Sequence, residues 1–331
     1  MRYIRKGAVM LFLLALTGCS KDEAGNDSDA PVPVRFEAGS PEVFKTRTEI
    51  NTLSNLQSAG FGVFAYYTGA TAWESAKASA TPNFMYNQQV TWGGTNSVWI
   101  YTPVKYWPND NYPADNTGAT GSQGHSYVSF FAYAPYTSSS IFSSNSATGG
   151  PTISYTWAAD ADLLYASQTD RYKYDSNDAN DNGRVGDVVP FIFRHALAKV
   201  VFKVRRSNDS HTVSLNSLSI SFKTTGTFNL ETASWSPLDG SGSNTYSASL
   251  PINVEATTEA LAHTVGSSIM LIPGSLTTYD VTYSVGGSNF THTDAPFASG
   301  LIPSPGYQYT IIFTIDGDAI KVDTQKYTEQ W

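Results

Sequence analysis

Hydrophobic and polar residues alternate with a period of two along many short stretches of this chain, as they do in strands with one buried face. Turn dipeptides such as Pro273-Gly274, Gly286-Gly287 and Pro305-Gly306 separate the later stretches. No stretch sustains a period of 3.6, so short helices are expected only at residues 51–58 and 73–80. The pattern predicts an all-β protein built from sandwiches. Strands are expected over residues 32–38, 61–67, 83–92, 98–107, 127–136, 153–157, 162–166, 188–193, 197–204, 213–222, 226–230, 248–254, 268–272, 279–285, 290–293 and 307–315.

The first of these strands has a distinctive position in the chain. Its polar residues alternate with four apolar residues, Val32, Val34, Phe36 and Ala38, and Gly39-Ser40-Pro41 ends it. A short distance further on, Arg47 offers a basic cleavage site for a protease in a segment expected to be exposed. The alternative is an ordinary exposed arginine, since any loop can hold one. If Arg47 is cut, the domain behind it loses a core strand that another strand must replace.

The residues before this strand have the features of an export signal. Arg2, Arg5 and Lys6 precede an apolar run over residues 8–16, which is too short to span a bilayer as a helix, and Leu16-Thr17-Gly18-Cys19 looks like a bacterial lipobox. We therefore expect a lipoprotein signal peptide at residues 1–18, lipid on Cys19, and a flexible tether at residues 19–31. An ordinary signal peptide followed by a coincidental cysteine is the alternative.

Length and composition limit the remaining possibilities. The chain has 331 residues, of which 41% are hydrophobic and 15% are charged. This length predicts two domains, at residues 32–194 and 195–331, with a junction near Arg194 and His195. The net charge of −8 argues against nucleic acid as a partner and against electrostatic binding to anionic membranes.

Few residues suggest a cofactor or catalysis. Asp178, Asn180 and Asn182 match the first half of a calcium loop, but Val189 stands where the bidentate glutamate belongs, so a solvated loop is the default interpretation. The histidines show no metal-ligand spacing, and His195 is expected to be packed or hydrogen-bonded. No hydrolase or phosphate-binding motif occurs. We expect no catalytic residues and no cofactor, although a glycosidase pair of carboxylates on separate strands stays open.

An aromatic run allows two interpretations. Alternating aromatic residues on strands are expected in the core, whereas an exposed set would form a platform for sugars. The residues concerned are Trp92, Trp99, Tyr101, Tyr106 and Trp107.

Several segments together resemble the fimbrillin family, the subunits of type V pili in Gram-negative bacteria. These segments are the lipobox, Asp162 to Ala166, Phe193 to Val204, the Pro-Gly-x-x-Tyr pattern at the start of residues 305–315, and the terminal Trp331. The resemblance covers most of the chain, but the loops at 109–126 and 137–150 match no known pattern.

The resemblance implies two transthyretin-like β-sandwiches in tandem and export to the cell surface as a lipoprotein of the outer membrane. It also implies cleavage at Arg47 by a processing protease, loss of the first strand, and filling of the resulting groove by a strand from another pilus subunit. Near the C-terminus, Ile320 and Val322 flank Lys321 in a segment that could pair as an edge strand or extend toward another subunit.

Two functions follow as expectations. The first is a non-enzymatic structural subunit of a fimbria, assembled by strand exchange and contributing to adhesion to a host glycan or protein. The second is a monomeric surface lipoprotein that binds glycan through exposed aromatic residues and long loops.

Overall fold

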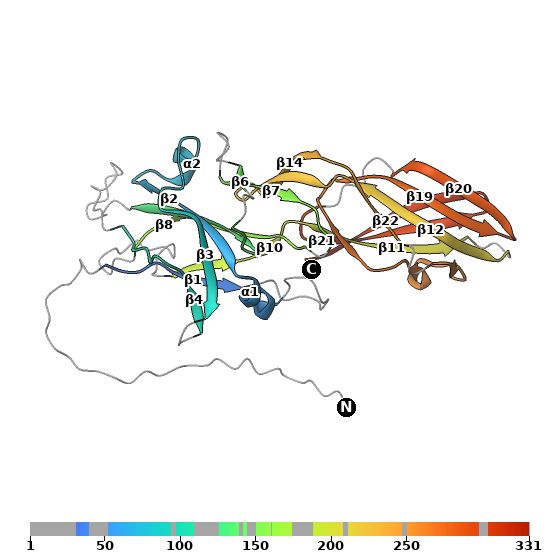
Figure 1. The fold of residues 1–331 in the computed structure, drawn as a ribbon, viewed down its shortest axis with the longest axis horizontal. Helices are drawn as coiled ribbons and strands as arrows, with labels where there is room; N and C mark the ends of the chain where they lie inside the picture. Colours follow the sequence, from blue (N-terminus) through green and yellow to red (C-terminus); the bar gives the residue numbers. More distant parts are fainter. Residues whose placement is uncertain are drawn as a thin grey trace, which may run out of the picture. The chain divides into compact units, whose positions relative to one another are not determined.

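The computed structural model describes residues 31–39, 52–93, 97–108, 126–138, 142–143, 150–159, 161–173, 188–207, 211–246, 250–297 and 304–330. Over these ranges the fold is nearly all strand, with the short helices α1 (Leu53–Ala59) and α2 (Trp73–Ala76) and a 3-10 turn, η1 (Glu259–Leu261) (Figure 1). The all-β prediction is confirmed. None of the helices in the described ranges has the length and apolar character needed to cross a bilayer.

A six-stranded antiparallel sheet organises the first half of the chain. Its middle strands are buried on both faces: Phe61, Val63 and Ala65 of one strand point into a first core, while Phe64 and Tyr66 point into another. The sheet order is β10 (Arg194–His195), β8 (Leu164–Arg171), β5 (Tyr127–Ala134), β2 (Phe61–Gly69), β3 (Met85–Gly93) and β4 (Val98–Ile100).

A two-stranded sheet covers one face of that six-stranded sheet. It consists of β1 (Arg35–Gly39) and β9 (Val188–Ile192), which pair in parallel. Phe36 and Phe191 of these strands belong to the same core cluster as Phe61 and Phe130 of the larger sheet. The first core therefore lies between the six-stranded sheet and the two-stranded sheet, and β1 is one of the two strands of the smaller sheet.

The second half of the chain forms a sandwich of two five-stranded sheets. One contains β17 (His263–Thr264), β11 (Ala198–Arg206), β18 (Ile269–Leu271), β21 (Tyr307–Asp316) and β22 (Ala319–Gln330). The other contains β15 (Gly242–Thr245), β12 (Val213–Phe222), β16 (Ile252–Asn253), β19 (Leu276–Val285) and β20 (Ser288–Pro296). As with β1 and β9, the first strand, β11, pairs in parallel with a late strand, β21.

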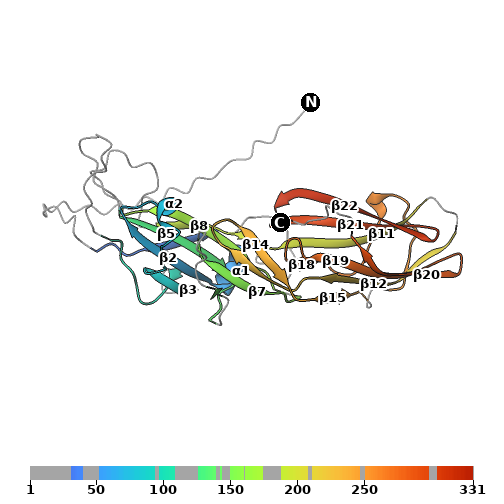
Figure 2. The ribbon, with the colours of Figure 1, turned by 90° about the horizontal axis from the view of Figure 1, so that it is seen from above.

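A four-stranded sheet joins segments from both halves. Its order is β14 (Ser234–Asp239), β13 (Thr225–Asn229), β7 (Thr152–Thr156) and β6 (Phe142–Ser143). Figures 1 and 2 show the green strand β7 and the yellow strand β14 in the same region of the fold, and β13 lies between them and pairs with both. The pairing of β7 with β13 crosses the predicted junction at residues 194–195.

Side-chain hydrogen bonds cross the same junction. The Trp157 indole N–H donates to the Met270 carbonyl oxygen at 2.6 Å, and the Trp73 indole N–H donates to the Glu231 carboxylate at 2.9 Å. By contacts, Val32–Trp331 forms one compact unit. The division into domains 32–194 and 195–331 stays a prediction.

The expected strands and the observed strands differ in a few places. The expected strand at residues 98–107 stops at Ile100, and Pro103, which has no N–H for a ladder hydrogen bond, lies in the bend that follows. Strand β8 extends to Arg171, into a region expected to be loop. Strands β14 and β15 lack an apolar alternation because most of their residues are exposed or half-buried. The edge-strand prediction for the C-terminal segment is confirmed, since β22 pairs with β21.

Candidate functional site

Strand β1 is held between two neighbours, and this arrangement defines the candidate site. On one side it pairs with β9, and the Phe193 N–H donates to the Gly39 carbonyl oxygen at 2.9 Å. On the other side, the Val34 N–H donates to the Lys105 carbonyl oxygen and the Trp107 N–H donates to the Val32 carbonyl oxygen, both at 2.9 Å. Strand β1 therefore bridges two segments that are distant in sequence.

The side chains of β1 follow the predicted alternation. Val34 is 1% exposed and Phe36 is 4% exposed, Val32 and Ala38 are half-buried, and Arg35 and Glu37 are exposed. Burying a large apolar side chain stabilises a fold by about 1.5–3 kcal/mol. Val34 and Phe36 thus anchor this segment. The predicted alternation of buried and exposed side chains over residues 32–38 is confirmed, but the strand itself covers Arg35–Gly39 and begins three residues later than predicted.

Aromatic contacts surround Phe36. Its ring centroid lies 5.6 Å from that of Phe191, 5.4 Å from that of Tyr101, and 6.0 Å from those of Phe61 and Phe130. Such pairs contribute about 0.5–1.5 kcal/mol each beyond their buried area. If β1 were absent, this aromatic cluster would lose its central member.

The Tyr101 hydroxyl ties β1 to the segment after β4. It donates to the Val34 carbonyl oxygen at 2.8 Å and accepts from the Lys105 N–H at 3.2 Å. Burial raises the pKa of Tyr101 above its usual value, so the hydroxyl stays protonated and able to donate.

The other edge of β9 is closed by side chains of β8. The Gln168 amide donates to the Pro190 carbonyl oxygen at 2.8 Å, and the Arg171 guanidinium donates to the Val188 carbonyl oxygen at 3.2 Å. Pro190 has no N–H to offer a further strand. Consequently, a strand that pairs with β9 is directed to the side where β1 lies.

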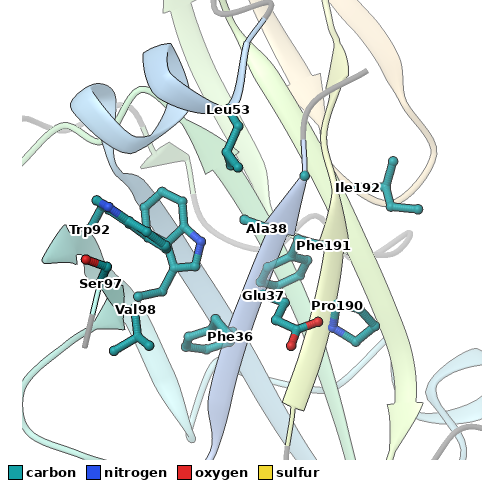
Figure 3. A pocket seen from close by; sticks show the side chains of 12 residues that line it. Phe36, Glu37, Ala38, Leu53, Trp92, Ser97, Val98, Pro190, Phe191 and Ile192 are labelled. Atoms are coloured by element: carbon teal, nitrogen blue, oxygen red, sulfur yellow. The ribbon is translucent and has the colours of Figure 1, made fainter. Parts of the chain in front are cut away.

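A pocket of about 530 Å³ lies beside the C-terminal end of β1 (Figure 3). Its other walls come from α1, β9 and the hairpin of β3 and β4. The lining residues are Phe36, Glu37, Ala38, Gly39, Leu53, Trp92, Ser97, Val98, Trp99, Pro190, Phe191 and Ile192.

The predicted donor residues near the C-terminus lie in an edge strand. Ile320 and Val322 of β22 are half-buried against the second core, and β22 is hydrogen-bonded to β21 of its own chain. The Asp323 carboxylate lies 3.1 Å from the Lys321 ammonium and 3.9 Å from the Arg205 guanidinium. Charged residues on an edge strand discourage unplanned pairing.

Several predicted site residues fall outside the described residues. These are Cys19, Arg47 and the candidate calcium residues Asp178, Asn180 and Asn182. Among the described residues, no group of three or more His, Cys, Asp or Glu side chains could hold a metal ion.

His195 is packed and hydrogen-bonded, as predicted. It is 2% exposed, and its Nδ1 lies 3.1 Å from Oδ2 and 3.2 Å from Oδ1 of Asp162. Asp162 Oδ1 also accepts from the Leu163 N–H at 2.8 Å. This buried pair connects β10 to the start of β8.

The aromatic run divides between core and surface. Trp99 and Trp107 are buried, and Tyr101 packs against the first core. Trp92 is 37% exposed and Tyr106 is 50% exposed. The core interpretation is confirmed for Trp99, Tyr101 and Trp107. It is wrong for Trp92 and Tyr106.

The sequence did not indicate which residues form the groove that holds β1. Gln168, Arg171 and Tyr101 act through hydrogen bonds to backbone carbonyls of β9 and β1, and these partners are remote in sequence. One signal was available, because a proline inside Val188–Ile192 marks β9 as an edge strand.

Comparison with known proteins agrees with this architecture. Residues 46–331 match a family model described as fimbrillin-like. Fimbrium subunit Fim1C of Phocaeicola vulgatus is 30% identical over 207 residues, which cover 58% of this chain and 48% of that protein. The aligned region thus spans about half the length of this curated relative.

A solved structure shares the fold. A fimbrial protein from Bacteroides vulgatus superposes with a TM-score of 0.60 at 23% identity, covering 90% of this chain and 99% of that one. Since the family model extends over most of the sequence, the chain belongs to the fimbrillin-like family.

Proposed function

We propose that the protein is a structural subunit of a cell-surface fimbria, exported as a lipoprotein and assembled by protease-triggered strand exchange. The observation that carries this proposal is the position of β1 between β9 and the Lys105–Trp107 segment. The family membership and the printed name of the relative Fim1C, a fimbrium subunit, support it.

Loss of β1 would create a binding groove. The backbone groups of β9 that now pair with β1 would lose their partners, and the sites of Val34 and Phe36 would be emptied. Unpaired backbone beside apolar surface is a template for strand addition. A donated strand with the same alternation would restore both kinds of contact.

The proposed sequence of events begins with lipid on Cys19, which holds the chain at the outer membrane. Cleavage after Arg47 then separates residues 19–47, including β1, from the rest of the chain. A strand of another subunit takes its place, and the C-terminal strand with Ile320 and Val322 is the proposed donor. Donation requires β22 to leave β21, which exposes part of the second core. The tandem sandwiches would be transthyretin-like.

Mass spectrometry of the protein taken from intact cell surfaces tests the processing step. We expect the assembled form to begin at Thr48. An Arg47→Ala variant should keep its first strand and stay out of filaments, whereas Arg35→Ala, a change at an exposed position within β1, should be processed normally. Filaments built of chains that still carry Cys19 joined to residues 32–38 would refute the proposal.

A second candidate function is adhesion through a glycan, and the exposure of Trp92 and Tyr106 favours it. A glycan array probed with the wild type and with a Trp92→Ala variant tests this function. We expect loss of signal in the variant if Trp92 forms part of a sugar platform. Binding by a strictly monomeric protein would favour this function over fimbrial assembly.

A further inference from the structure

The side chains of β1 leave part of the pocket at its C-terminal end unfilled. Ala38 is half-buried and presents one methyl group, and Figure 3 shows it on the side of β1 facing Leu53 and Trp92. Gly39, the next residue, is on the exposed face with Glu37, so Ala38 is the last inward-facing position of β1. Its methyl group leaves a volume of about 530 Å³ underfilled.

Most of the pocket wall does not belong to β1. Leu53, Trp92, Val98 and Ile192 contribute apolar surface, and they are 47%, 37%, 46% and 68% exposed. They are carried by α1, β3, β4 and β9, none of which belongs to the segment that cleavage at Arg47 would release. Exposed apolar groups that converge on one pocket indicate a binding site rather than scattered surface residues.

The pocket lies beside a length of strand edge that no described strand pairs. Among the described residues, the main-chain hydrogen bonds from β1 to the segment after β4 involve Val32 and Val34 and go no further toward Gly39. A strand that occupies the position of β1 presents its backbone to β9 and alternate side chains to the pocket.

We propose that this pocket selects the strand that replaces β1, by accepting a bulky apolar side chain such as Leu, Ile or Phe at the position of Ala38. The inference rests on the proposed strand exchange and adds the chemistry of the partner. The replacement strand belongs to another subunit and carries its largest anchor two residues beyond the position of Phe36. Because β1 offers only the methyl group of Ala38 at this position, it fills the groove less completely than its replacement.

This difference gives exchange a direction. The incoming strand forms the same main-chain hydrogen bonds as β1 and also buries apolar atoms that β1 lacks. Strands from unrelated proteins with a small or polar residue at that position would gain nothing over β1. The pocket thus discriminates among strands through one side chain.

Peptide exchange tests the proposal in the full chain. A sequence-specific protease site placed at residues 45–48 allows β1 to be released from the folded protein. Labelled peptides of residues 31–39 then compete for the groove that β1 leaves. An Ala38→Leu peptide should bind about fiftyfold more tightly than the wild-type peptide, because it buries three more carbon atoms at about 0.8 kcal/mol each and 1.4 kcal/mol is tenfold. An Arg35→Leu peptide is the matched control and should show no gain, since residue 35 faces solvent.

A second protein variant assigns the gain to the pocket. Val98→Asp places a charge in the pocket wall, so it should remove the preference for the Ala38→Leu peptide while the wild-type peptide still binds. Equal affinity of the two peptides for the unmodified groove would overturn the pocket inference and leave strand exchange standing. If neither peptide enters the groove, both strand exchange and the inference that rests on it fail.

Thermal unfolding of the uncut chain provides a readout that does not depend on exchange. An Ala38→Leu chain should melt about 3 °C above the wild type, because its side chain fills the pocket in the intact protein. A lower melting temperature would show that the pocket does not accept a larger side chain and would overturn the inference. Oligosaccharide binding that requires Trp92, with no peptide preference, would assign the pocket to a glycan and would also overturn it.

Discussion

The ring of Phe36 stacks on that of Phe191, with the centroids 5.6 Å apart and the planes 15° from parallel. These residues lie on neighbouring parallel strands, where Phe36 is opposite Val189 and Ala38 is opposite Phe191. Phe36 also meets Phe61 and Phe130 of the facing sheet edge-on. One side chain therefore contacts both walls of the first core, and the attachment of β1 depends on it.

Replacing Phe36 should strongly destabilise the protein before any cleavage. A Phe36→Ala variant removes the centre of the aromatic cluster and leaves a cavity, so the free energy of unfolding should fall by about 3–5 kcal/mol. Urea unfolding of the full chain, followed by tryptophan fluorescence, measures this loss.

The matched control is the next residue along β1. Glu37 is exposed, so Glu37→Ala should change the free energy of unfolding by no more than about 0.5 kcal/mol. If Phe36→Ala unfolds at the same urea concentration as Glu37→Ala, β1 is not an integral part of the first core.

Local patterns were enough to predict β1 and β22. A period of two reports which face of a strand is buried, and Val34, Phe36, Ile320 and Val322 all pack against cores as that period requires. The pattern needs no knowledge of the partner strand, which explains why it succeeds from sequence alone.

Partner choice could not be predicted in the same way. Strand β1 pairs with β9, and β7 pairs with β13, although long stretches of chain separate the members of each pair. These pairings depend on which apolar faces meet in the folded chain, and sequence spacing does not encode that. The hydrogen bonds of Gln168 and Arg171 to β9 follow from the same long-range arrangement.

The buried pair of Asp162 and His195 should be needed for stability. Both side chains are 1% exposed, and Asp162 also accepts a hydrogen bond from the Leu163 N–H. Asp162→Ala would remove the acceptor from two buried donors, at a cost of about 3 kcal/mol. Thermal and urea unfolding measure the effect.

An Asp162→Asn variant shows how much of the lost stability is due to the missing hydrogen-bond acceptor, because asparagine has nearly the shape of aspartate. Asp162→Asn keeps an oxygen for the Leu163 N–H, so it should cost about half as much as Asp162→Ala. Wild-type stability in the Asp162→Ala variant would show that the pair contributes nothing.

Alkaline pH should weaken the fold through Tyr133. Burial raises the pKa of Tyr133 to about 12, while the hydrogen bond that the Thr137 N–H donates to its hydroxyl opposes this rise. The unfolded chain releases the same proton near its ordinary pKa of about 10. The folded state therefore binds more protons between these values, and stability falls as the pH rises from about 10 to 12.

Urea midpoints measured from pH 8 to pH 12 check this prediction. The midpoint should be constant below about pH 10 and then decrease. A Tyr133→Phe variant, which has no titrating hydroxyl at this position, should show a shallower decrease. Identical slopes in the two proteins would mean that Tyr133 does not contribute to the alkaline loss.

The pairing of β7 with β13 predicts how the C-terminal half behaves alone. A fragment of residues 195–331 lacks β7, so the edge of β13 from Thr225 to Asn229 loses its partner strand. Hydrogen exchange of the β13 amides should accelerate on the order of a hundredfold relative to the full chain. Amides between β12 and β19 are the internal control, because both strands lie within the fragment and should keep their protection.

A peptide of residues 150–158 added to this fragment should restore the protection of β13. It supplies β7 and also Trp157, whose indole N–H donates to the Met270 carbonyl oxygen in the full chain. A Trp157→Ala peptide should protect β13 less well, because it lacks this hydrogen bond and the ring contact with Phe222. If β13 is as protected in the bare fragment as in the full chain, residues 195–331 form an independent domain and the strand contributed by β7 is dispensable.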